Sequence, residues 1–226
     1  MSKDLGLRFE FHSHTIFSDG QLLPLALALE AEHKEHAVIA LTDHVDPSNL
    51  VITVKSLVRF CQEITGKTKI KILPGAEISY LPPDQIEKYA KQARKLGTKI
   101  IIVHGESVAE PAVPKGTNHA ALQLKGLVDI LAHPGMITEA DVQLARENNI
   151  FLELSARHGH REGNKHVAAL AKKIGAKMLV NTDAHNEKDL ITQEQALQIA
   201  LTAGLSEAEA IKIIRKNPLE LLAAIK

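Results

Sequence analysis

Cysteine, long apolar runs and a targeting segment are all missing or scarce in this sequence. Cys61 is its one cysteine, so no intramolecular disulfide can form, and its place in a helical pattern predicts a buried, unreactive thiol. The lack of disulfides favours a reducing compartment. The N-terminal residues have no apolar signal-peptide region, and no run approaches the ~18 apolar residues that cross a membrane. We therefore expect a cytoplasmic protein with no membrane contact.

Charge of one sign and large aromatic side chains are also scarce. Lys and Arg together number 27, as do Asp and Glu, so the formal net charge is zero, and the chain has two Tyr and no Trp. Proteins that bind single-stranded nucleic acid combine a basic groove with aromatic stacking. The composition therefore argues against nucleic acid as a partner, although a local basic patch stays open. It does not indicate an oligomeric state.

Short apolar runs alternate with helical patterns along the whole chain. Runs rich in Val, Ile and Leu, with little polar alternation, are typical of strands buried on both faces. They lie at 7–14, 37–44, 70–79, 98–105, 128–134, 150–156 and 177–183. Helical patterns lie at 22–36, 53–65, 83–96, 118–125, 139–148, 163–174 and 192–203, followed by short helices at 206–216 and 218–225. Strand followed by helix, repeated in this way, predicts a parallel α/β protein.

The domain organisation predicted from these patterns is simple. The 226 residues suit one barrel or two smaller domains, and no linker rich in Pro, Gly or Ser divides them. We expect one domain over 1–226, with the chemistry in 9–186 and C-terminal helices in 187–226 that cover the barrel bottom or a partner subunit. A closed barrel and an open doubly wound sheet both fit the alternation.

The ends of the apolar runs carry the chemical signal. Parallel strands of a barrel place their C-terminal ends on one rim, whereas an open sheet gathers ligands only at its switch point. Residues of the types that bind metals lie at nearly every strand end, which predicts that the sheet closes into an irregular barrel of seven units. It also predicts a polynuclear metal site on the rim of that barrel. The run ends are His12-Ser13-His14, Asp43-His44, Glu77, His104, His133, Arg157 and Asp183-Ala184-His185.

Spacing supports the metal interpretation. Residues two apart on a strand face the same side, so His12 and His14 can reach one cation. The carboxylate of Glu77 could bridge two cations ~3.5–4 Å apart. Asp19, in a Phe-Ser-Asp-Gly turn after the first strand, could lean over the rim or only cap its turn. Nitrogen and oxygen ligands without thiolate suit Zn, Mn or Fe.

Other polar residues divide into rim candidates and structural ones. Arg157 at a strand end could bind a phosphate with its guanidinium fork or pair with a neighbouring carboxylate. His160 is a candidate for substrate binding or proton transfer, and Glu153 for orienting a ligand from behind or for an ion pair. Solvated or structural positions are expected for His33, His36, Glu106, His119, Arg161, Lys165 and His166.

Six motifs follow one another between about residues 9 and 186. They are His12-Ser-His14-Thr with Ser18-Asp19-Gly20, Thr42-Asp43-His44, Gly75-Ala-Glu77, Val103-His104, Leu131-Ala-His133-Pro and Asn181-Thr-Asp183-Ala-His185. In content and order they resemble the PHP family, named for polymerases and histidinol phosphatases. The resemblance implies a distorted (β/α)7 barrel with two or three divalent metal ions at the C-terminal ends of the strands.

The resemblance also implies how the candidate ligands divide. It places His12, His14, Glu77 and Asp183 in a first set and Asp19, His44 and His185 in a third. The second set is Glu77, His104 and His133, with Glu77 bridging. In several relatives a histidine fills the role that the resemblance assigns to Asp19. All nine ligand positions are filled in this sequence.

The function implied is hydrolysis of a small-molecule phosphomonoester, in the manner of histidinol-phosphate phosphatases, by a hydroxide bridging the metal ions. Glu77, Asp183 and His185 would be the catalytic residues, and Arg157 and His160 would bind the substrate. One alternative is a phosphodiesterase or 3'-5' exonuclease that acts on nucleotides or single strands. Another is a non-catalytic metal-binding partner, similar to the RNA-processing subunits that resemble this barrel.

Overall fold

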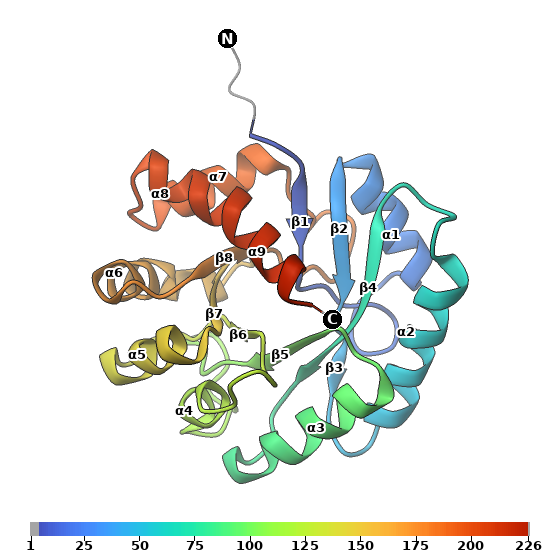
Figure 1. Ribbon diagram of the computed structural model, residues 1–226, viewed down its shortest axis with the longest axis horizontal. Coiled ribbons are helices and arrows are strands. Elements are labelled where there is room, and N and C mark those ends of the chain that lie inside the picture. The colour runs from blue at the N-terminus through green and yellow to red at the C-terminus, as the bar shows by residue number, and fades with distance from the viewer. Residues whose placement is uncertain (1–4, 226) are drawn as a thin grey trace.

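The computed structural model describes residues 5–225 and shows a ring of parallel strands enclosed by helices (Figure 1). The hydrogen-bonded order is β1-β2-β4-β5-β6-β7-β8, with a short β3 paired to β4, so the expected α/β barrel is confirmed. The strands are β1 Arg8–Glu10, β2 His36–Leu41, β3 His44–Val45, β4 Lys71–Ile78, β5 Ile100–His104, β6 Ile130–Ala132, β7 Phe151–Ser155 and β8 Met178–Asn181.

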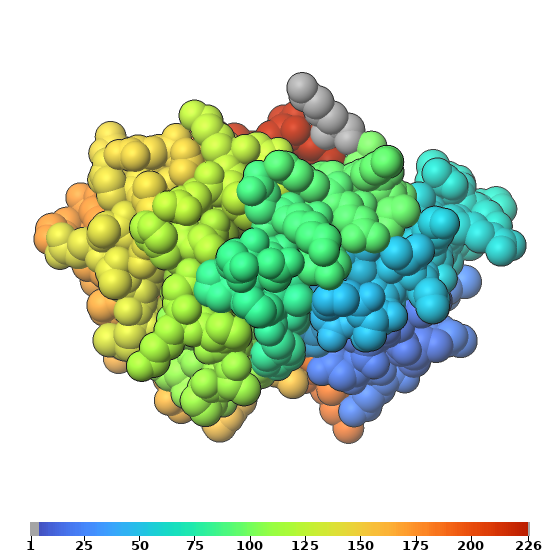
Figure 2. Space-filling view, turned by 90° about the horizontal axis from the view of Figure 1, so that it is seen from below, coloured from blue at the N-terminus to red at the C-terminus, as the bar shows by residue number. Residues whose placement is uncertain are grey.

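Helices follow the strands and form the outer wall, where consecutive segments lie side by side in chain order (Figure 2). The α-helices are α1 Pro24–His33, α2 Leu50–Ile64, α3 Ile86–Leu96, α4 Thr117–Leu122, α5 Glu139–Asn148, α6 Asn164–Ile174, α7 Gln193–Thr202, α8 Glu207–Ile211 and α9 Asn217–Ala224. Short helical turns are η1 Pro83–Gln85, η2 His160–Gly163 and the π-helical η3 Lys212–Lys216.

Local signals in the sequence explain several helix ends. Thr138 accepts a hydrogen bond from the amide of Asp141 at the start of α5, and Ser206 with Glu209 forms the expected capping box at α8. Gly97 ends α3 in the left-handed conformation that glycine adopts without strain. Among the residues described, no helix is long and apolar enough to cross a membrane.

The second predicted strand is interrupted, which the sequence pattern did not indicate. The amide of Thr42 donates to the carbonyl of Ser13, and the carboxylate of Asp43 accepts the amide of Thr15 at 2.7 Å. These bonds tie residues 42 and 43 to the loop after β1, so β2 ends at Leu41 and the chain resumes as β3. The β3 register then places His44 directly beside Glu77 of β4.

Few main-chain bonds close the barrel between β8 and β1. Ser13 and Ala184 form a single parallel bridge near the upper rim. Below it, buried charged side chains replace the missing ladder: Arg8 donates to the carbonyl of Val180 at 2.8 Å, and Glu10 accepts the amide of Thr182 at 3.1 Å. Backbone groups that would lack partners are thereby satisfied, and the first and last strands present their ends to the same rim.

Apolar side chains fill the barrel interior below that rim. This interior cluster includes Phe11, Ile102, Phe151 and Leu179, and Leu221 of α9 packs into it from the closed end. Figure 1 shows α9 crossing the ring, with the chain end near its centre. Helix α9 therefore covers the barrel bottom, whereas α7 and α8 pack in the outer layer, and the C-terminal ends of the strands form the open end.

Candidate metal centre

The candidate ligands lie where the strands end. Glu77 is in β4, His104 is the last residue of β5, and His44 begins the short β3. The others follow their strands by one to four residues, except Asp19, which lies nine residues beyond β1. Seven of the nine side chains are almost fully buried. The side chain of His44 is 20% exposed, and that of Asp19 is 57% exposed because it comes from the turn after β1.

The backbone around the site is tightly folded. His133 and Asp183 adopt positive φ values of 25° and 53°, a conformation that costs non-glycine residues energy and is common where side chains are aimed at a functional site. A Cβ on Gly20 would lie 2.3 Å from the carbonyl of His14. Only glycine allows this approach, which folds the Asp19 turn back over the rim.

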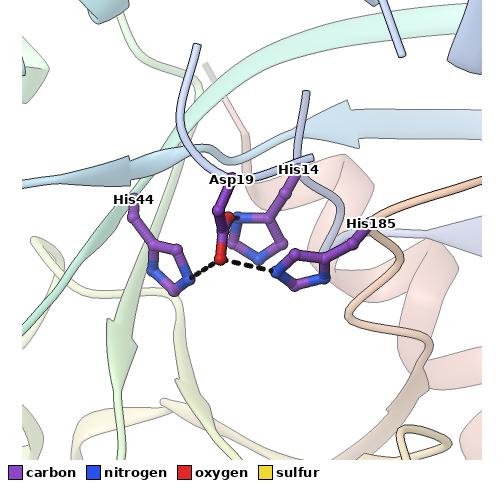
Figure 3. A group of neighbouring side chains, drawn as sticks. All are labelled: His14, Asp19, His44 and His185. Carbon is purple, nitrogen blue, oxygen red and sulfur yellow. Dashed lines mark hydrogen bonds and ion pairs between the residues drawn. The ribbon is translucent and has the colours of Figure 1, made fainter. Parts of the chain in front are cut away.

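One group of donors gathers around His14 (Figure 3). Ligand atoms of His14, Asp19, His44 and His185 all lie within 4.8 Å of one another. Asp19 Oδ2 is 3.1 Å from His185 Nε2 and 3.8 Å from His44 Nε2. The third predicted set is thus brought together, with His14 added to it. The turn carrying Asp19 does lean over the rim.

The other donors gather around Glu77 and Asp183. Glu77 Oε1 is 3.3 Å from His12 Nε2 and 3.8 Å from His133 Nε2, and Asp183 Oδ1 is 3.0 Å from His14 Nε2. Mutually close ligand atoms define three further groups: His12, His133 and Asp183; His12, His14 and Glu77; and Glu77, His104 and His133. Glu77 belongs to two of them, so its carboxylate is placed to bridge.

Several buried nitrogen and oxygen atoms in this cluster that could bind a metal ion have no hydrogen-bond partner. They are His12 Nε2, both ring nitrogens of His14, both carboxylate oxygens of Glu77, His133 Nδ1 and Asp183 Oδ1. A buried polar atom without a partner is costly, and most of these atoms point toward one another. Divalent cations bound by nitrogen and oxygen would satisfy them together. The donor set therefore fits a metal centre.

Burial and neighbouring charges shift the pKa values of the candidate histidine ligands in opposite directions. Burial and the neighbouring His44 lower the pKa of His14 well below its usual value. Against the effect of burial, the carboxylates of Glu153, Glu77 and Asp183 raise the pKa of His12 well above its usual value. His14 is therefore held neutral, with a ring nitrogen free to bind a cation.

A further layer of residues orients the donors. His12 Nδ1 lies 2.8 Å from Glu153 Oε1, and the other oxygen of Glu153 accepts the amide of His133 at 3.0 Å. Because a carboxylate accepts, Nδ1 of His12 carries a proton, so Nε2, which faces Glu77, is the ring nitrogen that could bind a cation. This is the arrangement in which second-layer carboxylates fix metal-binding histidines. The position suggested for Glu153 is confirmed.

Arg157 and His160 lie at the edge of the cluster. Nε of Arg157 is 3.6 Å from Asp183 Oδ2, and its Nη1 is 2.7 Å from His185 Nδ1, so Arg157 contacts the candidate ligands while remaining partly exposed. The ring of His160 stacks on that of His133 with centroids 4.0 Å apart. Its Nε2 is 3.6 Å from Asp183 Oδ2.

Sequence reasoning missed Glu110, Tyr80 and Ser107, and it misplaced His36. Glu110 comes from the loop after β5, and its carboxylate lies against His104 and His160. A signal was present, since this loop directly follows the strand that ends in His104. The expectation that His36 is solvated was wrong: it is 4% exposed, because it begins β2 beside Arg8 of β1 rather than ending α1.

The remaining polar candidates lie away from the cluster. His119 Nδ1 contacts Asp141, and His166 Nε2 donates to the carbonyl of Ile137. Glu106 accepts the amides of Gly116 and Asn118 within its own loop. His33, Arg161 and Lys165 are exposed. These residues have the structural or solvated positions expected of them.

The sequence matches the PHP domain family over residues 10–152. It is 40% identical over 220 residues to an uncharacterized protein of Methanocaldococcus jannaschii, covering 97% of this chain and 100% of that protein. It is 27% identical to a probable phosphatase of Thermoanaerobacter sp. strain X514, covering 89% and 88%. It is 26% identical to the DNA polymerase/3'-5' exonuclease PolX of Bacillus subtilis, covering 80% of this chain but 34% of that protein.

Solved structures share the fold at much lower identity. A Xaa-Pro dipeptidase with bound methionine superposes with a TM-score of 0.65 and 13% identity, covering 96% of this chain and 75% of that one. At this identity the likeness concerns the barrel alone.

Proposed function

Because this chain belongs to the PHP domain family, we propose that it is a metal-dependent phosphatase of small-molecule phosphomonoesters, similar to histidinol-phosphate phosphatases. One observation carries this proposal. Buried nitrogen and oxygen atoms from almost every strand end converge without hydrogen-bond partners, and Arg157 lies at the edge of this cluster. The name of the Thermoanaerobacter relative, a probable phosphatase, supports the same chemistry.

The nine converging side chains would hold two or three divalent ions, of Zn, Mn or Fe type: His12, His14, Asp19, His44, Glu77, His104, His133, Asp183 and His185. Once bound, such ions neutralise phosphate oxygens and make a bound water acidic enough to act as a nucleophile. Glu77, shared between two groups, would hold neighbouring ions at a fixed separation, and Asp183 and His185 would complete the catalytic set.

The chain's own side chains would position the substrate. The guanidinium of Arg157 lies at the edge of the cluster and is partly exposed. It can therefore bind the equatorial oxygens of a phosphate and stabilise the charge that develops on them. His160 presents Nε2 toward Asp183, while Ser107 Oγ lies 2.6 Å from its Nδ1. The hydroxyl thereby fixes the ring orientation, and His160 can hold or deliver a proton near the leaving oxygen.

A second candidate is a phosphodiesterase or 3'-5' exonuclease, and the PolX relative favours it. That match covers 34% of PolX, whereas the M. jannaschii and Thermoanaerobacter relatives match along most of their length. The zero net charge and the absence of Trp also argue against a single-strand groove. We therefore place the monoesterase first. The nine filled positions argue against a non-catalytic partner.

The test is hydrolysis by the metal-loaded protein of a phosphomonoester panel, beside a phosphodiester and a short single strand. We expect monoesterase activity that falls at least about 100-fold in Glu77→Gln, because this side chain serves two cation positions. Glu162→Gln, an exposed carboxylate on the same rim, is the matched control and should retain activity. Diesterase activity alone would favour the second candidate, and no hydrolysis with metals bound would contradict both.

A further inference from the structure

The loop between β5 and α4 brings one more carboxylate to the metal centre. Glu110 Oε2 lies 3.2 Å from His104 Nε2, and Oε1 lies 3.4 Å from His160 Nε2. The hydroxyl of Tyr80 donates to Oε2 at 2.5 Å. The carboxylate is 32% exposed, so it faces the open end of the barrel rather than its core. Neither the sequence motifs nor the family resemblance gave this residue a role.

The orientation of the His104 ring indicates what Glu110 faces. Nδ1 of His104 lies 3.1 Å from the carbonyl oxygen of Gly105, which can only accept a hydrogen bond. Nδ1 therefore carries the proton, and the lone pair of Nε2 is directed at Glu110. Two electron-rich atoms at 3.2 Å need a positive charge between them, which a proton on Nε2 or a divalent cation could provide.

The surrounding donors favour a cation at this place. His104 belongs with Glu77 and His133 to one group of mutually close ligand atoms. Because its Nδ1 faces the carbonyl of Gly105, Nε2 is the ring nitrogen that can bind a cation there. A cation held by this group would lie on the Nε2 side of the ring, which Glu110 borders. The Glu110 carboxylate lies outside this group of mutually close ligand atoms, so its side chain would turn inward to bind. Two atoms 3.2 Å apart, each ~2.1 Å from a cation, subtend about 100° at it, which suits tetrahedral or octahedral coordination.

The loop is held firmly enough to place a ligand. Glu106 accepts the amides of Gly116 and Asn118, each at 3.0 Å, which fixes the two ends of the loop to each other. At its start, a Cβ on Gly105 would lie 2.1 Å from the carbonyl of Ala132, so the loop is pressed against the neighbouring strand end. Ser107, near the start of the loop, contacts His160.

The balance of charge also favours a further carboxylate. The nine predicted donors include three carboxylates, Asp19, Glu77 and Asp183, against which two or three divalent ions would bring four to six positive charges. Arg157 already adds positive charge at the edge. A fourth carboxylate on the open side reduces this excess, and within residues 5–225 the ion pairs and side-chain hydrogen bonds of Glu110 involve no Lys or Arg.

We propose that Glu110 is an additional metal ligand, which completes the cation position formed by Glu77, His104 and His133 from the open side of the barrel. Tyr80 is its positioning residue, because its hydroxyl fixes the carboxylate that would bind. The inference rests on the proposed function in one respect only: it requires that this site binds divalent cations.

The test measures metal binding without substrate. Metal-free wild type, Glu110→Gln and the exposed-carboxylate control Glu162→Gln are titrated with Mn²⁺ and with Zn²⁺ against a competing chelator. We expect Glu110→Gln to bind one equivalent at least about tenfold more weakly, with the other equivalents and the control unchanged. Tyr80→Phe should weaken the same equivalent by a smaller factor, because the carboxylate remains but is less well oriented.

A spectroscopic measurement makes the test independent of affinity alone. Co²⁺ bound at this position should change its visible absorption between wild type and Glu110→Gln, because the ligand set changes. Circular dichroism of the metal-free variant shows whether it is folded, and Glu110→Asp, which shortens the carboxylate, serves as a second variant. Rescue of the lost equivalent by Asp would support coordination.

Three results would overturn the proposal. The first is an unchanged isotherm and cobalt spectrum in Glu110→Gln. The second is unchanged metal binding with tighter inhibition by inorganic phosphate, which would make Glu110 a competitor of the substrate rather than a ligand. The third is a wild type that binds no divalent ion. By contrast, a wild type that binds ions but hydrolyses no phosphoester would contradict the proposed function. The role of Glu110 as a ligand would still be decided by the metal-binding isotherms.

Discussion

His36 shows how far the surroundings of one side chain can change its chemistry. It lies at the start of β2, at the end of the barrel opposite the metal centre, and its Nε2 donates to the carbonyl of Ile191 at 2.9 Å. Burial, together with the guanidinium of Arg8, lowers the pKa of His36 to about 3. The unfolded chain would bind a proton at this residue near pH 6.5, whereas the folded chain does not.

This difference predicts a pH dependence of stability. Between pH 6.5 and about 3 the unfolded state binds one more proton at His36, so the stability present above pH 6.5 is lost as the pH falls. His36→Gln keeps an N–H donor but cannot titrate. Between pH 7 and pH 5 its unfolding free energy should fall by about 2 kcal/mol less than that of wild type. Urea unfolding of both metal-free proteins measures this, and equal losses would contradict the explanation.

At the residue scale, what sequence reasoning found and missed has a physical reason. His12, Glu77 and His104 could be proposed because each ends or follows an apolar run, and parallel strands bring such ends together. Glu110 lies six residues beyond the run that ends in His104, so its place depends on how an irregular loop folds over the rim. His36 was misplaced because the predicted helix ran to residue 36, whereas α1 ends at His33 and β2 begins at His36 after two intervening residues.

At the scale of elements, α9 closes the bottom of the barrel through one face. Leu221 is 2% exposed and packs with the interior cluster, while Leu219 on the same helix is 54% exposed. We expect Leu221→Ala to lower the free energy of unfolding by about 2–5 kcal/mol, because it leaves a cavity in the barrel interior. Leu219→Ala should change it by less than about 0.5 kcal/mol. Similar losses in the two variants would show that α9 does not act as a plug.

Elements themselves were predictable where one period continued for long enough. The run at 70–79 became β4 and the pattern at 139–148 became α5, since apolar periodicity and a Thr138 cap agreed. The run at 37–44 broke into β2 and β3, because Asp43 binds the distant loop of Thr15 and Ser18. Such long-range hydrogen bonds cannot be read from a local pattern.

At the scale of the whole molecule, the metal centre is a cross-link of the barrel. Its candidate ligands come from or follow β1, β3, β4, β5, β6 and β8, and they include both sides of the weakly paired β8–β1 seam. Nearly all the donors are buried, so they can meet only when the ring is closed. A cation that binds them therefore binds the folded chain and not the unfolded one, and its binding free energy adds to the stability of the fold.

This linkage gives a prediction for the intact protein. At a free metal concentration of about 100 times the dissociation constant, wild type should gain about 2.7 kcal/mol for each cation bound. For a chain of this length that corresponds to a rise of roughly 5–10 °C in Tm. Glu77→Gln should lose most of the rise, because Glu77 joins two ligand groups, whereas Glu162→Gln should keep it. Differential scanning calorimetry with and without Mn²⁺ or Zn²⁺ measures the shift. An equal shift in Glu77→Gln would mean that the stabilising cation binds outside this centre, which would remove the structural basis for placing catalysis there.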